Sequence, residues 1–276
     1  MRPLTMLSLF VLLFNFSLCF TASASLLISP TRVLIEDRDR SAKVILINTS
    51  EEVRSYRVEW VQQRALPTGG YKELTEQELE TFPIASSMIR MSPKQVRLAP
   101  GERQIVKLAV RRPKGLAEGE YRSHLRFKAL PPEKEVEAKT ATEGSAFNLK
   151  LILSYSIPVI VREGKLDYSV NIDDSQVVTS QDKGKTRYDL EVSMSRTGLN
   201  STEGSLRAYW TPNGSNEEVL IGILNSVHFY PELKQAKYKL FWQAPEVEPK
   251  SGTLRVAYEG RKEFQGIVFS EKKYTL

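Results

Sequence analysis

The chain has 276 residues, with 39 Lys and Arg against 33 Asp and Glu, a formal net charge of +6 and one cysteine. Basic and acidic residues are interspersed along the chain, which argues against nucleic-acid binding, because that function favours clustered basic residues beside stacking aromatics. The single cysteine, Cys19, excludes a fold held by internal disulfides, so the hydrophobic core must stabilise the chain.

Residues 1–24 have the pattern of a cleaved signal peptide. Arg2 supplies a positive charge, residues 4–20 are mostly apolar, and residues 22–24 (Ala-Ser-Ala) are the small residues that signal peptidase requires. An uncleaved anchor helix is the alternative, but the apolar run is short for a membrane span of about 20 residues. No later apolar run has that length, so we expect no membrane insertion of the mature chain, which is long enough for two domains.

From residue 25 onward the hydrophobic pattern has a period of two, which predicts short strands. Clusters of Asn, Pro, Gly and Ser separate these runs and predict antiparallel hairpins. One exception is residues 75–82, where Thr75 and Glu78 have the spacing of a capping box and predict one or two helical turns within a loop. The clearest strand candidates in this half are residues 44–47, 56–60, 105–110 and 124–127.

A charged stretch, residues 131–145, has no apolar period and is predicted to be a mobile loop. A long strand is predicted to follow it, from Phe147 to Val161. Residues 162–165 then have the composition of an interdomain joint, and the strand pattern resumes to the end of the chain. The sequence therefore predicts an all-β protein with two immunoglobulin-like β-sandwich domains, residues 25–161 and 162–276.

Catalytic and cofactor motifs are absent from the sequence. The two histidines, His124 and His228, each lie beside a strand-like run with no cluster of metal ligands, so we interpret both as structural. Neighbouring carboxylates such as Asp173 and Asp174 point to opposite faces of a strand and make poor acid/base pairs. We expect no enzyme activity, no metal and no cofactor; a hydrolase on a sandwich fold would need convergent carboxylates or a metal cluster.

Four segments resemble the PapD-like periplasmic pilus chaperones, in the order seen in that family. They are residues 27–33 (LISPTRV), 98–108 (LAPGERQIVKL), 118–127 (EGEYRSHLRF) and 130–132 (LPP). The resemblance covers residues 26–161 well and the second half by position and strand content only. It implies an L-shaped pair of sandwiches that binds pilus or fimbrial subunits, completes their fold by donor-strand complementation and delivers them to an outer-membrane usher.

The resemblance also implies roles for particular residues. Phe147, Leu149, Leu151 and Leu153 fall on one face of the long strand and would form the donor row. Arg32 matches the family's cleft arginine, whose planar guanidinium suits a client's terminal carboxylate. The family's second anchor is a lysine, but counting back from Pro158 places Leu153 there; Lys150, three residues earlier, is the substitute that the sequence offers. Glu120 and Lys107 match a charged pair inside the family's first domain, and we expect them to support its structure.

An exposed apolar row has two further consequences. It is an aggregation hazard, so the free protein would be expected to hide it in a self-dimer. Without the resemblance, the same row would be assigned to the chain's own core. A secreted two-domain immunoglobulin-like adhesive or scaffold protein is the alternative function, and it would be found outside the cell rather than in the periplasm.

Overall fold

The computed structural model describes residues 25–131, 153–182, 185–243 and 251–275. The predicted signal peptide lies outside the described residues. So do most of the predicted charged loop and four residues of the predicted donor strand and anchor: Phe147, Leu149, Lys150 and Leu151.

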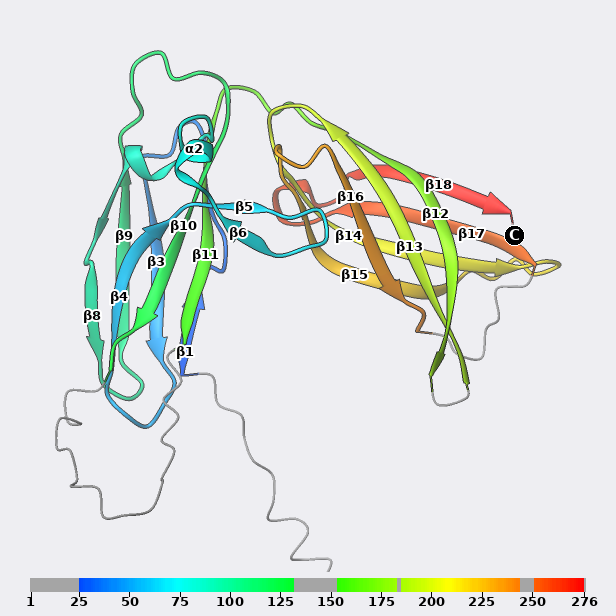
Figure 1. The fold of residues 1–276 in the computed structure, drawn as a ribbon, viewed down its shortest axis with the longest axis horizontal. Coiled ribbons are helices and arrows are strands. Elements are labelled where there is room, and N and C mark those ends of the chain that lie inside the picture. Colours follow the sequence, from blue (N-terminus) through cyan, green and yellow to red (C-terminus); the bar gives the residue numbers. More distant parts are fainter. Residues whose placement is uncertain (1–24, 132–152, 183–184, 244–250, 276) are drawn as a thin grey trace, which may run out of the picture.

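The first half of the chain folds into two sheets packed face to face (Figure 1). In the first sheet the strand order is β1 (Leu26–Ser29), β3 (Ser41–Asn48), β9 (Arg103–Val110) and β7 (Ile89–Ser92). In the second sheet the order is β2 (Val33–Ile35), β11 (Ser154–Glu163), β10 (Gly119–Ala129), β4 (Arg54–Val61) and β8 (Gln95–Leu98).

Alternating side chains build the core of this first sandwich. On β3, Val44 and Leu46 are fully buried, and they lie opposite or diagonal to the buried Val106 and Leu108 of β9. Phe127 of β10 reaches the same core from the other sheet. The period of two read from the sequence is therefore the inward and outward alternation of a sandwich.

Short elements connect the strands of the first sandwich. β5 (Gln63–Ala65) and β6 (Tyr71–Glu73) form a two-stranded hairpin, which extends toward the second half of the chain in Figure 1. The predicted capping box is confirmed in α2 (Glu76–Leu79): the Thr75 side chain accepts a hydrogen bond from Glu78 N, and the Glu78 carboxylate accepts one from Thr75 N. A 3₁₀ turn, η2 (Ser86–Met88), precedes β7.

The second half folds into another pair of sheets. One has the order β12 (Ser169–Asp182), β13 (Lys185–Thr197) and β16 (Gln235–Phe241). The other has the order β15 (Val219–Phe229), β14 (Thr202–Pro212), β17 (Gly252–Gly260) and β18 (Val268–Thr275), with the 3₁₀ turn η3 (Lys262–Phe264) between β17 and β18. Trp210, Phe229 and Tyr258 are among its largest fully buried side chains.

The two sandwiches lie at an angle to each other, and their facing ends are in contact (Figure 1). β11 continues two residues past the predicted boundary at 161/162, to Glu163, and β12 begins at Ser169. Ile160 of β11 and Ala65 of the hairpin pack into the core of the second sandwich. Within the described ranges, no helix is both long enough and apolar enough to cross a membrane.

Candidate functional site

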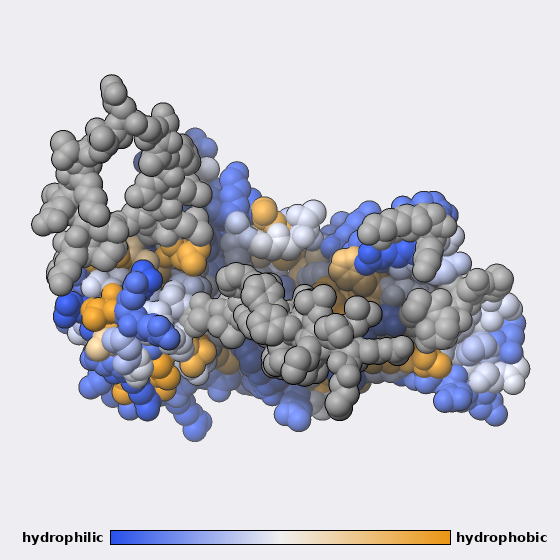
Figure 2. Space-filling view, turned by 90° about the horizontal axis from the view of Figure 1, so that it is seen from below, coloured by the Kyte–Doolittle hydropathy of each residue, from blue (hydrophilic) through white to orange (hydrophobic). Residues whose placement is uncertain are grey.

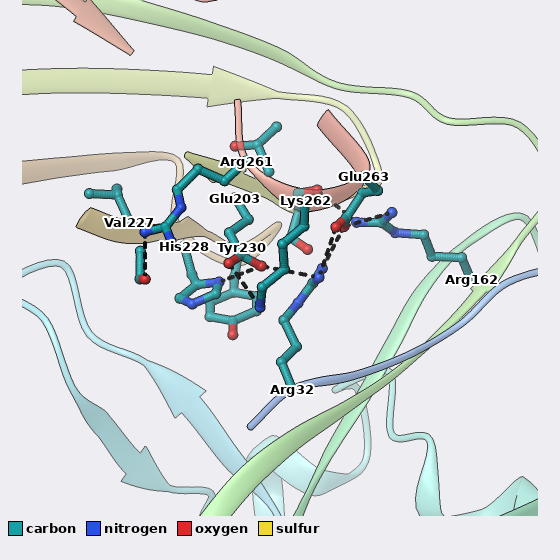
Figure 3. Close-up of polar contacts among 12 residues, drawn as sticks. Arg32, Arg162, Glu203, Val227, His228, Tyr230, Arg261, Lys262 and Glu263 are labelled. Atoms are coloured by element: carbon teal, nitrogen blue, oxygen red, sulfur yellow. Dashed lines mark hydrogen bonds and ion pairs between the residues drawn. The ribbon is translucent and has the colours of Figure 1, made fainter. Parts of the chain in front are cut away.

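Arg32 lies at the junction of the two sandwiches, immediately before β2. That short strand pairs in parallel with β11, with Val33 opposite Val159. The Arg32 side chain is only 4% exposed, and it points at the second sandwich (Figure 3). Its two terminal nitrogens donate to the Glu263 carboxylate at 3.2 and 2.9 Å, and Nη1 also lies 3.2 Å from Glu203 Oε2. The predicted anchor arginine is therefore already paired with carboxylates of its own chain.

Arg162, near the end of β11, lies on the other side of Glu263. Its Nη1 is 3.4 Å from Glu263 Oε1, its Nη2 donates to Ser201 O at 3.0 Å, and its Nε donates to Glu120 Oε2 at 3.2 Å. The same Glu120 oxygen accepts hydrogen bonds from the Ser201 amide and hydroxyl at 3.0 and 2.7 Å. Glu120 thus links the end of β11 to the second sandwich.

The predicted pair of Glu120 with Lys107 is wrong. Glu120 is buried on β10 in the second sheet, and its cationic partner is Arg162. Lys107 lies on β9 in the opposite sheet, and its side chain is exposed because it alternates with the buried Val106 and Leu108. A lysine that points away from the core cannot reach a carboxylate buried in the other sheet.

Glu203 completes the group of charges at this junction. Its carboxylate is 1% exposed and lies between Arg32, Lys262 Nζ at 3.0 Å and His228 Nδ1 at 3.9 Å. Burial lowers the pKa of His228 to about 4, against the attraction of Glu203, so this ring is neutral at neutral pH. Three cations and three carboxylates share the ion pairs of this cluster: Arg32, Arg162, Lys262, Glu120, Glu203 and Glu263.

Arg32 and Glu263 hold each other in the ionised form. Burial opposes the charge of Arg32, but the hydrogen bond and charge of Glu263 and the charge of Glu203 raise its pKa above the ordinary value. Burial likewise opposes ionisation of Glu263, but the Arg32 guanidinium lowers the pKa of that carboxyl overall. The junction therefore carries a bound carboxylate at neutral pH.

A second group of contacts joins the sandwiches through the hairpin. Arg122, 3% exposed, pairs with both carboxylate oxygens of Glu232 and lies 3.8 Å from the centre of the Tyr230 ring. Glu232 also accepts the Ala65 amide at 2.9 Å, and the Tyr71 and Tyr230 hydroxyls are 3.0 Å apart. A cavity of about 300 Å³ opens beside Arg122. Its lining residues are Thr81, Phe82, Pro83, Glu120, Arg122, Pro231 and Glu232.

The described part of the predicted donor strand is exposed and incompletely paired. Leu153 is 49% exposed, and its carbonyl accepts a hydrogen bond from Ala129 N at 3.2 Å. β11 pairs with β10 along its whole length, from Ser154 to Glu163, whereas its ladder to β2 covers only Val159–Val161. Figure 2 views this lower end and shows several apolar patches on the first sandwich.

Sequence reasoning singled out Arg32, which lies at the junction, but missed its partners. Glu263 is 231 positions from Arg32 in the sequence, so no local pattern connects them. Arg162 was assigned to the interdomain joint; its position directly after the buried run Val159–Val161 was a signal that it continues the strand. Among the described residues, no group of His, Cys, Asp and Glu is arranged to hold a metal ion.

Fold and junction together define an all-β protein of two immunoglobulin-like sandwiches. The family model described as "Pili and flagellar-assembly chaperone, PapD N-terminal domain" matches residues 25–166, more than half of the chain. The chain therefore belongs to this family of pilus-assembly chaperones. Its members are chaperones and not enzymes.

Comparison with curated protein sequences found no match. Among solved structures, the YadV chaperone is 15% identical, with 92% of this chain and 100% of that chain covered and a TM-score of 0.46. The CupB2 chaperone of Pseudomonas aeruginosa is 11% identical, with 90% and 98% covered and a TM-score of 0.47. The SafB chaperone of Salmonella enterica, in complex with SafA pilin, is 15% identical, with 93% and 98% covered and a TM-score of 0.44.

Proposed function

We propose that the protein is a periplasmic chaperone that binds pilus or fimbrial subunits by donor-strand complementation. The observation that carries the proposal is the edge of β11. Its first half has no β2 partner within the described residues, and Leu153 is exposed directly before it. A free edge with apolar side chains is a template for an added strand of another protein.

The donor row would supply the binding energy. Phe147, Leu149, Leu151 and Leu153 alternate along the sequence, so an extended backbone presents them on one face. Each side chain inserted into the core of a subunit would contribute about 1.5–3 kcal/mol. Each ladder hydrogen bond would add about 0.5–1.5 kcal/mol. Several of each exceed the cost of association, and no bond is made or broken.

Arg32 is the proposed anchor for the terminal carboxylate of the subunit, with Lys150 as the second cation that the sequence offers. An arginine held at the end of the donor sheet would fix the register of the added strand, because a bidentate pair is directional. A register error of one residue would turn the apolar row away from the subunit's core.

Export by the predicted signal peptide would bring the chain to the periplasm, and the loaded chaperone would pass its subunit to an outer-membrane usher. Exchange of the donor strand for a better-fitting strand of the next subunit would drive assembly without a nucleotide. Cell fractionation tests the location. Recovery of the mature protein at the cell surface would instead favour the adhesive or scaffold alternative.

The strand is tested by co-expression with a pilus subunit of the same organism. We expect the double variant Leu149→Asp/Leu151→Asp to abolish accumulation of the pilin, because charged groups cannot enter its core. The matched control is Leu220→Asp, a change at an exposed leucine on β15 of the second sandwich. A pilin that accumulates equally with the double variant and with the control would disprove donation by this strand.

A further inference from the structure

We propose that Arg162 is the second arginine of the client carboxylate site, and that Glu263 occupies this site in the free chain and leaves it when a client binds. This inference rests on the proposed function. It assigns the site to Arg32 and Arg162, on neighbouring segments of one sheet, in place of Arg32 and Lys150. Its ligand class is a single carboxylate, such as the chain terminus of a pilin.

The geometry already shows a carboxylate held between the two arginines. Glu263 Oε1 lies 2.9 Å from Arg32 Nη2 and 3.4 Å from Arg162 Nη1. In Figure 3 the carboxylate lies between the two guanidinium groups. Both arginines belong to the first sandwich and flank the β2–β11 ladder, whereas Glu263 reaches them from η3 of the second sandwich. An incoming strand on the free edge of β11 would end where β2 begins, beside Arg32.

Glu263 fills this site incompletely. The Arg32 and Arg162 side chains are 4% and 3% exposed, yet Arg32 Nε and Arg162 Nη1 have no hydrogen-bond partner. Buried donors are normally satisfied, and a carboxylate offers about four acceptor positions. A carboxylate that is free of the η3 turn is able to approach Arg162 more closely than Glu263 does.

The charge balance also favours one exchangeable anion. Glu120 and Glu203 are 1% exposed, and each holds one of the two arginines from within the protein. Glu263 is 18% exposed, the most accessible of the three carboxylates. With Glu263 displaced, the three cations and two remaining carboxylates of the cluster would leave one positive charge, which one client carboxylate would neutralise.

The turn that carries Glu263 has one residue in a costly backbone conformation. Lys262, which precedes it, has a φ of 54°, a left-handed conformation that is costly for a residue with a Cβ atom. Phe264, which follows, is 1% exposed and fixes the turn. Because Phe264 holds the turn in place, release of the carboxylate requires only rotation of the Glu263 side chain into the solvent.

The experiment measures binding of a peptide from the C-terminal end of a pilus subunit of the same organism, prepared as the free acid and as the C-terminal amide. Glu263→Ala in the full mature chain should raise the affinity for the free acid about tenfold, and leave that for the amide unchanged, because the internal competitor is gone. Glu217→Ala, which removes an exposed glutamate of the same sandwich, is the control for net charge and should change neither affinity.

Two double variants assign the second cation. Adding Arg162→Gln to Glu263→Ala should abolish the gain, whereas adding Lys150→Ala should preserve it. Equal binding of acid and amide to Glu263→Ala, or a gain that survives Arg162→Gln and is lost with Lys150→Ala, would overturn the assignment. If intact pilin does not bind the wild-type chain, the proposed function fails as well; if it binds without dependence on Glu263 or Arg162, only this inference fails.

Loss of Arg162 leaves Glu120 buried without its cation, so the Arg162→Gln change needs a control for folding. Arg162→Lys keeps the charge, and thermal unfolding reports whether either variant is folded. The wild-type chain gives an independent measurement, the NMR signal of the Arg32 Nε–H group. The free acid should shift this signal and the amide should not; identical shifts with both peptides would contradict the site.

Discussion

Removal of Glu232 should destabilise the contact between the two sandwiches. Arg122 belongs to the first sandwich, and its guanidinium lies between the Glu232 carboxylate and the Tyr230 ring, with Gln63 O at 3.3 Å. In Glu232→Ala the arginine stays charged and buried but loses its carboxylate. The Ala65 amide loses its acceptor in the same step.

The expected cost follows from the burial of the two partners. Breaking a fully buried ion pair from one side costs about 3–5 kcal/mol. The Glu232 side chain is 17% exposed, and water entering its place would relieve part of this cost. We therefore expect a loss of about 3 kcal/mol. If the two sandwiches unfold as one unit, Tm should fall by about 6–12 °C.

Urea unfolding of the mature chain measures the loss. The control is Glu52→Ala, whose side chain is 72% exposed in a surface pair with Arg54. That change should cost less than about 1 kcal/mol. In a double-mutant cycle with Arg122→Met, the summed costs of the two single changes should exceed the cost of the double change. Additive costs, or a loss no larger than in the control, would refute a coupling between these residues.

Two further predictions concern the cores. Burial, with the nearby Arg122 charge, lowers the pKa of His124 to about 3 from its ordinary 6.5, so the folded chain binds fewer protons than the unfolded chain between these values. The His124 contribution is thus present above pH 6.5 and lost as pH falls; His124→Phe should flatten this decline in urea titrations, and equal slopes would contradict it. Gly204→Ala should cost about 1–3 kcal/mol, because its Cβ would lie 2.4 Å from Tyr258 Cε2. Gly222→Ala, whose nearest contact would be 3.3 Å, should cost less; equal unfolding free energies for the two variants would contradict this account.

The strands and the small helix of this fold could be predicted because their signals are local. Alternation along residues 105–110 directly predicts which side chains of β9 face the core. The Thr75 capping box depends on residues three positions apart, and it formed as predicted. The same alternation already argued against the predicted Glu120–Lys107 pair. Lys107 stands between two core residues on its strand and so had to point outward.

The composition of the junction could not be predicted, because its contacts are not local in the sequence. Its arginines come from the first sandwich, while Glu203, Glu232 and Glu263 come from the second. Which acid meets which arginine depends on the angle between two separately folded units. A period of two within each strand contains no information about that angle.

The contact between the sandwiches is specified more by these charges than by apolar packing. Ile160 and Ala65 are the only buried residues of the first sandwich in the second hydrophobic core, as far as the described residues show. A buried ion pair adds little net stability, because desolvation offsets its attraction, but it strongly penalises arrangements that leave a charge unpaired. Such an interface fixes one orientation and still permits exchange of a carboxylate for another of equal charge. Replacing Glu263 by a client carboxylate would therefore preserve the charge balance at Arg32 and Arg162, while Arg122 and Glu232 hold the two sandwiches together beside it.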